Sequence, residues 1–150
     1  MTRINLVHAA DLADQHLFAE WREIKMVPAA LRRSLKTRNI DDILAGIPKR
    51  YTLNKGHVTF FFNKMLFLYD RYNELTEELD DRGYKLTYHD PGFIFFRDIN
   101  ETFRQEEWEP SADEIAVNTE RILLRIGEKP DWYKYLGIPL TADFYKKYEV

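Results

Sequence analysis

Three stretches in which apolar residues recur every three or four positions constrain the fold more than any other feature of this sequence. The first runs from Asp11 to about Ile24 and places Ala13, Leu17 and Trp21, with Ile24, on one face. This spacing matches the 3.6-residue period of an amphipathic helix. Asp11 is a residue type that often caps a helix N-terminus, so we expect the first helix to begin there.

Two further stretches have the same period. The second is expected to form one helix from about Val58 to Arg82, with Gly83 as the residue that ends it. Its face is set by Phe60, Phe61, Lys64, Leu68, Leu75 and Leu79. The third is expected to begin at the cap Ser111, with Glu114 in the capping-box position, and to end at Gly127.

The remaining segments carry weaker signals. Residues 37–56 are rich in helix-breaking residues, and only 41–44 favour a short helical turn. Residues 84–109 resemble a loop, with a short strand expected at 93–96. Pro28 is expected to kink the first helix or to start its successor, and 141–148 to be helical. We therefore predict an all-α fold: one compact domain over residues 1–150, with three principal helices, long irregular connections and an aromatic C-terminal segment.

The composition limits the kinds of site. The chain has no cysteine, which excludes disulfides and thiolate metal sites, and it has no apolar stretch of membrane-spanning length. The histidines His8, His16, His57 and His89 lack metal-ligand spacing. We expect a cytoplasmic, monomeric protein without a metal site.

Charge is distributed unevenly along the chain. The net charge is −3, but residues 1–56 contain ten Lys or Arg against six Asp or Glu, whereas residues 57–150 contain twelve against nineteen. Such a distribution is compatible with a basic face and an acidic back, or with ordinary solvated surface.

Along the predicted first helix, away from its apolar face, runs a strip of mainly polar side chains. Gln15, His16, Ala19, Arg22 and Glu23 stand at positions i, i+1, i+4, i+7 and i+8. At 100° per residue these side chains share one narrow strip, and the small Ala19 leaves space between them. An amide, an imidazole, a guanidinium and a carboxylate would form a site here, although solvated helix faces often have a similar composition.

Five blocks of the sequence resemble one known family in order and approximate spacing. They are Thr2–Leu6, Leu12–Leu17, Ala19–Glu23, Gly56–Phe61 and Pro130–Tyr135. The chain resembles the endonuclease V type of pyrimidine-dimer glycosylases. The resemblance implies an all-helical enzyme that cuts double-stranded DNA at cyclobutane pyrimidine dimers without metal or cofactor.

The resemblance also assigns the chemistry. It implies that Met1 is removed and that the α-amine of Thr2 is the nucleophile, forming an imine with the damaged sugar. An α-amine suits this role because its pKa of about 7.7–8.0 leaves much of it neutral near pH 7. Glu23 matches the essential carboxylate, which would stabilise the developing positive charge and accept a proton during elimination.

DNA contacts follow from the same resemblance. Arg3 and Arg22 match phosphate-binding positions, Gln15 and His16 match pocket residues, and Arg121 and Arg125 stand where the family has basic residues. The aromatic segment Trp132, Tyr133, Lys134 and Tyr135 has the makeup of a surface that contacts DNA near the lesion.

One departure leaves the substrate open. Where the phage enzymes have an arginine one turn after the glutamate, this chain has Met26. The same chemistry could act on other base lesions or on abasic sites, or the fold could persist as a DNA-binding homologue without catalysis. An unrelated helical interaction protein, docking a partner through its aromatic tail, is a further alternative.

Overall fold

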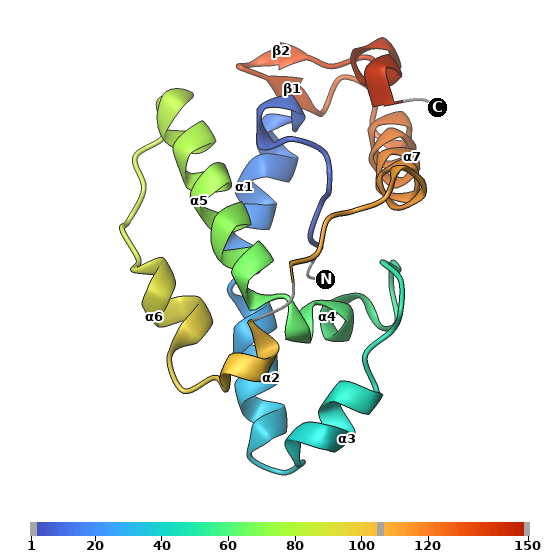
Figure 1. The fold of residues 1–150 in the computed structure, drawn as a ribbon. Helices are drawn as coiled ribbons and strands as arrows, with labels where there is room; N and C mark the ends of the chain where they lie inside the picture. The colour runs from blue at the N-terminus through green and yellow to red at the C-terminus, as the bar shows by residue number, and fades with distance from the viewer. Residues whose placement is uncertain (1–2, 105–106, 149–150) are drawn as a thin grey trace.

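The computed structural model describes residues 3–104 and 107–148, and it is mostly helical (Figure 1). The α-helices are α1 (Asp14–Glu23), α2 (Met26–Leu35), α3 (Ile40–Ala45), α4 (His57–Phe60), α5 (Met65–Asp81), α6 (Pro91–Phe96) and α7 (Ala112–Glu128). The 3-10 helices are η1 (Ala9–Asp11), η2 (Phe61–Asn63), η3 (Glu101–Phe103) and η4 (Ala142–Tyr148). An antiparallel pair, β1 (Lys134–Tyr135) and β2 (Ile138–Pro139), forms the only sheet in the described ranges. The all-α prediction is confirmed.

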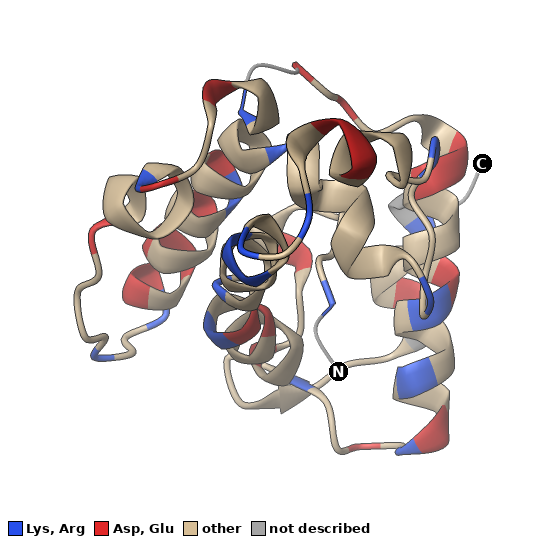
Figure 2. Ribbon diagram, turned by 90° about the horizontal axis from the view of Figure 1, so that it is seen from below, with Lys and Arg blue, Asp and Glu red and all other residues tan. Residues whose placement is uncertain are grey.

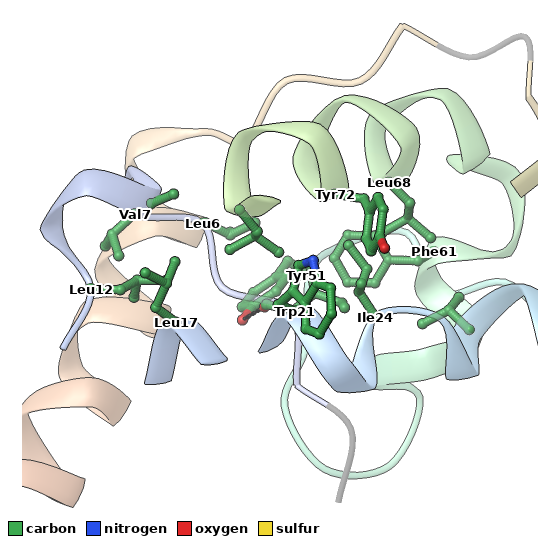
Figure 3. Packing of buried hydrophobic residues seen from close by; sticks show 14 of the residues in the cluster. Leu6, Val7, Leu12, Leu17, Trp21, Ile24, Tyr51, Phe61, Leu68 and Tyr72 are labelled. Atoms are coloured by element: carbon green, nitrogen blue, oxygen red, sulfur yellow. Dashed lines mark hydrogen bonds between the residues drawn. The ribbon is translucent and has the colours of Figure 1, made fainter. Parts of the chain in front are cut away.

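Helix α5 packs against α1 and α6 (Figure 1). The predicted apolar face of α1 is buried, and Leu17 and Trp21 pack in one cluster with Leu68 and Tyr72 of α5 (Figure 3). Burying such side chains contributes roughly 1.5–3 kcal/mol each, so this contact stabilises the fold.

The segment before α1 belongs to the core as well. Ile4, Leu6 and Val7 are 0–8% exposed, and the segment runs between α1 and α7 (Figure 1). The backbone of Ile4 is held at both ends: its N–H donates to Nε2 of His57 at 2.7 Å, and its C=O accepts from the Tyr51 hydroxyl at 2.8 Å. The start of the described chain is therefore fixed in place by tertiary contacts.

Several local predictions are confirmed. Gly83 has φ 92°, and the backbone N–H of Tyr84 reaches the carbonyl of Leu79 at 3.1 Å, which is the Schellman pattern. Ser111 and Glu114 form the capping box. Pro28 lies in the first turn of α2, and the turns expected at 41–44 and 141–148 form within α3 and η4.

The first helix begins later than predicted. Asp11 ends η1, and α1 starts at Asp14 after the N-cap Ala13, which makes no side-chain cap. The Asp14 carboxylate instead binds Arg82 at 2.9 Å and the backbone N–H of Leu136 and Gly137 at 3.1 Å each. Tertiary partners thus replace the local cap that the sequence suggested.

The predicted continuous helix over 58–82 is also wrong, because the chain breaks at Lys64, where φ is −126° and ψ is 36°. The Lys64 ammonium donates to the carbonyl of Phe60 at 3.0 Å and to the side chain of Asn63 at 2.8 Å. A side chain therefore satisfies a carbonyl that the interrupted helix leaves without its usual partner. Helix α2, ten residues long, is the successor helix that Pro28 was expected to start.

Residues 93–96 form part of helix α6 rather than the predicted strand. Asp90 caps its start by accepting from the N–H of Gly92 at 3.0 Å, and Pro91 suits the first turn. At its end, Arg32 donates to the carbonyl of Ile94 at 2.6 Å. These capping contacts outweigh the strand preference of the aromatic run. Gly127 lies inside α7, which continues to Glu128, so the predicted end was one residue early.

The C-terminal hairpin was not expected. Leu136 and Gly137 join its strands with φ of 49° and 81°, as a two-residue turn with positive φ at both positions requires. No helix in residues 3–104 and 107–148 combines the length and apolar character needed to cross a membrane.

Candidate active site

A cavity of about 190 Å³ opens between the N-terminal segment, α1 and α7. Its lining residues are Arg3, Asn5, His16, Ala19, Glu20, Glu23, Arg121, Ile122, Arg125 and Tyr133. Six of them were predicted site residues, although they come from both ends of the sequence. Asn5, Glu20 and Ile122 are the lining residues that the sequence did not indicate.

Helical periodicity explains how the cavity residues are presented. His16, Ala19 and Glu23 are three and four positions apart on α1, and Arg121 and Arg125 are four apart on α7. In both helices the apolar stripe is turned into the core, which leaves the polar side chains facing each other across the N-terminal segment.

Three guanidinium groups make the cavity electropositive. Burial, followed by the nearby charges of Arg121 and Arg125, lowers the pKa of Arg3 below its ordinary value. The Nε atom of Arg121 is buried and has no hydrogen-bond partner among the described residues. Clustered cations and a free donor stabilise a bound anion, so the cavity is suited to a phosphate group.

His16 is uncharged in this surrounding. Burial, together with Arg3 and Arg125, lowers the pKa of His16 to about 4. Its ring lies against Tyr133, with the ring centroids 4.4 Å apart, and its Nδ1 atom is buried with no hydrogen-bond partner among the described residues. At neutral pH the imidazole therefore offers a neutral donor or acceptor and no charge.

Two carboxylates line the cavity, and they differ in their bonding. Glu20 is 1% exposed, and its oxygens accept hydrogen bonds from Arg71 and Asn5. Glu23, the last residue of α1, is half-buried, and within the described ranges no hydrogen bond or ion pair holds its carboxylate. Glu23 is therefore the carboxylate available to a substrate.

The predicted strip on α1 is divided between two sides of the helix. His16 and Glu23 face the cavity, whereas Gln15 and Arg22 line a separate groove with Lys134. The Gln15 amide donates to the carbonyl of Trp132 at 2.6 Å and accepts from the N–H of Lys134 at 3.0 Å. Neighbouring positions differ by 100°, and the hairpin docked on one side separates them. Gln15 thus holds the hairpin and does not line the cavity as predicted.

The aromatic C-terminal segment is divided in the same way. Trp132 is 55% exposed, while Tyr133 packs on His16 in the cavity wall. Tyr135 is half-buried between Arg82 and Phe144, at 4.2 and 5.3 Å from its ring centroid. Of the four residues, Tyr135 covers the core and is not part of an exposed surface.

The uneven charge of the sequence does not map onto two faces. Lys and Arg occur on the helices at both sides of the N-terminal segment, α1–α2 and α7 (Figure 2). Two of the three cavity arginines, Arg121 and Arg125, belong to the acidic part of the chain. Folding gathers basic side chains from both parts around one cavity.

One signal in the sequence was overlooked. Glu20 and Arg71 occupy core positions in their helices, and they form a buried ion pair at 2.7 Å. Charged residues are rarely buried unless they are paired. Their presence on apolar faces could therefore have indicated a buried polar network, which also includes Asn5 and Asn118.

The predicted nucleophile, Thr2, lies outside the described residues, as does Met1. The next residue, Arg3, lines the cavity. Among residues 3–104 and 107–148, no three His, Cys, Asp or Glu side chains are grouped as a metal site would require.

An electropositive cavity with one available carboxylate and a neutral histidine, set in a helical fold, is suited to binding an anionic group such as a phosphate and to accepting a proton. A family model described as pyrimidine dimer DNA glycosylase matches residues 1–91 of the chain. The matched region carries Arg3, His16 and Glu23. The chain belongs to the pyrimidine dimer DNA glycosylase family. It is a DNA-repair glycosylase of this type, and its substrate is DNA.

Proposed function

We propose that the chain cleaves the N-glycosidic bond of the 5′ pyrimidine in a cyclobutane pyrimidine dimer and then breaks the strand as an AP lyase. The observation that carries the proposal is that Glu23 and Arg3 line one cavity. Arg3 directly follows Thr2 in the sequence, and consecutive Cα atoms are about 3.8 Å apart. After loss of Met1, the Thr2 amine would supply the nucleophile.

The chemistry proceeds in two stages. The neutral Thr2 amine attacks C1′, and the C1′–N bond breaks as the base leaves with the bonding electrons and a proton. The sugar ring opens as the nitrogen forms an imine with C1′. The Glu23 carboxylate then removes a proton from C2′, and the resulting electron pair expels the 3′ phosphate by β-elimination. Every step uses this chain's own groups, without metal or cofactor.

The other side chains have binding and positioning roles in this proposal. Arg3, Arg121 and Arg125 hold the phosphate next to the lesion, and neutral His16, supported by Tyr133, offers a hydrogen bond to the sugar. On the other side of α1, Arg22 and Lys134 would contact the DNA backbone, and Trp132 is exposed for stacking on a base. Gln15 and Tyr135 support this surface from behind.

A trapping experiment tests the proposal. The mature protein is incubated with duplex DNA that carries a single dimer, and with the same duplex carrying an abasic site. Borohydride reduces an imine to a stable amine, so both substrates should give a covalent protein–DNA adduct. An added residue before Thr2 is the control, because it moves the amine by up to about 3.5 Å and should suppress the adduct.

The two substrates separate the alternatives. Met26 is 53% exposed and uncharged at the position where the phage enzymes have an arginine, so dimer specificity is the part of the proposal that the comparison of substrates tests. Adduct with abasic DNA alone would assign lyase chemistry without dimer specificity. Absence of adduct with both substrates, despite DNA binding, would leave a non-catalytic DNA-binding homologue and overturn the enzymatic proposal.

A further inference from the structure

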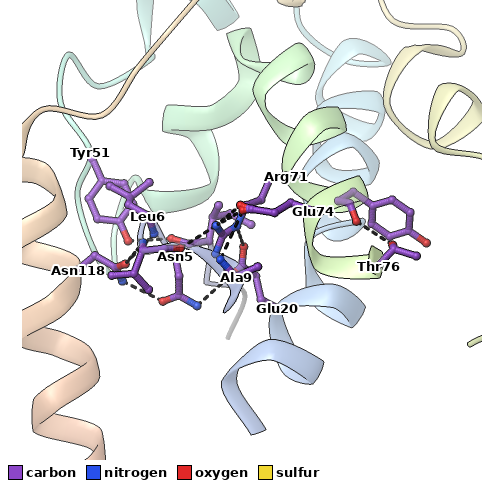
Figure 4. Close-up of polar contacts among 12 residues, drawn as sticks. Asn5, Leu6, Ala9, Glu20, Tyr51, Arg71, Glu74, Thr76 and Asn118 are labelled. Carbon is purple, nitrogen blue, oxygen red and sulfur yellow. Dashed lines mark hydrogen bonds and ion pairs between the residues drawn. The ribbon is translucent and has the colours of Figure 1, made fainter. Parts of the chain in front are cut away.

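A chain of buried polar side chains ties the N-terminal segment to three helices. Asn118 of α7 is 0% exposed, Asn5 4%, Glu20 of α1 1% and Arg71 of α5 6%. The Asn118 amide donates to Asn5 at 2.9 Å, and the Asn5 amide donates to Glu20 at 2.9 Å. Arg71 completes the chain with bonds of 2.7 and 3.0 Å to the Glu20 carboxylate (Figure 4).

The direction of every bond in this chain is fixed. An ionised carboxylate only accepts hydrogen bonds, so the NH₂ group of Asn5 must face Glu20. The Asn5 carbonyl then faces the NH₂ group of Asn118, whose carbonyl accepts from the backbone N–H of Leu6 at 2.6 Å and of Val7 at 3.3 Å. If either asparagine amide flipped, two donors or two acceptors would face each other. The amide orientations are therefore fixed, and they fix the backbone N–H groups of Leu6 and Val7 that bond to Asn118.

Arg71 holds the same backbone from the opposite side, because its Nη1 donates to the carbonyl of Val7 at 2.7 Å. Hydrogen bonds to Asn118 of α7 and from Arg71 of α5 therefore hold the segment in place (Figure 4). Unpaired buried polar groups are costly, which makes the arrangement all-or-none.

Three of the four elements joined by the network, the N-terminal segment, α1 and α7, also carry a cavity residue close by. Glu23 is three residues after Glu20 on α1, and Arg121 is three residues after Asn118 on α7. At 1.5 Å per residue, this separation is about 4.5 Å along each helix axis. Arg3 is two residues before Asn5. A shift at Asn118 would thus move the start of the chain relative to Glu23.

We propose that Asn118, acting through Asn5, is a positioning residue that sets where the amine at the start of the chain meets Glu23. The inference rests on the proposed imine chemistry. A misplacement of about 1 Å can cost on the order of a hundredfold in rate. Replacing the Asn118 amide should therefore slow imine formation without removing any group that touches the DNA.

The test variant is Asn118→Asp, which keeps the shape and the acceptor for Leu6 but turns a carboxylate toward the Asn5 carbonyl. Imine formation is measured as the single-turnover rate of borohydride trapping on abasic DNA, and we expect it to fall at least about tenfold. A small primary amine added to the solution should restore strand cleavage, because it forms its own imine with the abasic aldehyde while Glu23 removes the C2′ proton.

A second substitution that exchanges donor and acceptor along the network should restore trapping in Asn118→Asp. In the double variant Asn118→Asp with Glu20→Gln, Asn5 can flip, donate to the new carboxylate at position 118 and accept from the new amide at position 20. The amide carbonyl at position 20 still accepts from Nε of Arg71, whereas Nη2 of Arg71 loses its acceptor there. Trapping should recover at least in part. Thr119→Val is the matched control on α7: the Thr119 hydroxyl is buried but bonds only within its helix, to Ile115 at 2.8 Å. Its trapping rate should stay within about twofold of wild type.

The outcomes separate this inference from the proposed function. No adduct with the wild-type protein would overturn the function itself. A wild-type adduct combined with an unchanged rate in Asn118→Asp, or with an equal loss in Thr119→Val, would overturn only the positioning role. Circular dichroism checks folding, and Asn118→Ser is the second variant. If neither Asn118 variant nor the double variant folds, the network serves stability and the positioning role is rejected.

Discussion

Arg71 donates hydrogen bonds to Glu20, Glu74 and the carbonyl of Val7 while only 6% of its surface is exposed. Burial by itself would lower the pKa of Arg71, but Glu20 and Glu74 raise the pKa above its ordinary value. The substitution Arg71→Met keeps much of the side-chain volume and removes every donor. The Glu20 carboxylate, itself 1% exposed, then keeps only its bond from Asn5.

Removal of one partner from a buried ion pair costs about 3–5 kcal/mol, because the other charge stays buried without compensation. With a urea m-value of about 2 kcal/mol per molar, the unfolding midpoint of Arg71→Met should fall by roughly 1.5–2.5 M. The double variant Arg71→Met with Glu20→Gln should recover part of this loss, since no buried charge remains. Arg104→Met breaks an ion pair with the exposed Glu101 and should cost no more than about 1 kcal/mol.

Urea unfolding followed by circular dichroism at 222 nm measures all three variants. The reasoning requires Arg71→Met to be far less stable than Arg104→Met, and the double variant to lie between Arg71→Met and wild type. Equal midpoints for Arg71→Met and Arg104→Met would show that the buried pair contributes nothing beyond a surface pair. A double variant less stable than Arg71→Met would show that the unpaired charge is not the cause.

Three further outcomes are expected. Glu23→Gln should bind dimer-containing DNA with unchanged affinity in fluorescence anisotropy and cleave it about 10²–10⁴-fold more slowly in single turnover; unchanged turnover would remove Glu23 from the mechanism. Burial is the largest cause that lowers the pKa of both His16 and His57, so the folded state binds fewer protons than the unfolded chain, whose histidines titrate near 6.5. The stability that these neutral histidines contribute is present above pH 6.5 and, for His16, is lost as the pH falls toward about 4. Between these pH values the melting temperature of His16→Gln should fall less than that of wild type, and an equal fall would contradict the lowered pKa of His16. Arg121→Gln and Arg125→Gln should each lower the slope of log Kd against log salt by about one, and a slope equal to that of wild type would place that side chain away from phosphate.

Features with local causes could be predicted from the sequence. The apolar faces of α1 and α7, the capping box at Ser111 and the αL residue Gly83 depend on neighbours within a few positions, and all are present. Glu23 was singled out because it lies in the block Ala19–Glu23 that resembles the family. It lines the cavity.

Features with distant causes could not be predicted. Asn118 bonds to the backbone of Leu6 across 112 residues, and no pattern in either segment indicates the other. Helix α1 begins at Asp14 because Arg82 and the hairpin use its carboxylate. In both cases a polar side chain took a tertiary partner in place of a local one. The break at Lys64 has local partners, Phe60 and Asn63, but helical periodicity does not reveal it.

The structure of the borohydride-trapped complex with abasic DNA would show which nitrogen has formed the imine. We expect a covalent bond between the nitrogen of Thr2 and C1′, with the Glu23 carboxylate within about 3 Å of C2′ and the adjoining phosphate between Arg3 and Arg121. A bond from a lysine to C1′, or a Glu23 carboxylate out of reach of C2′, would contradict it.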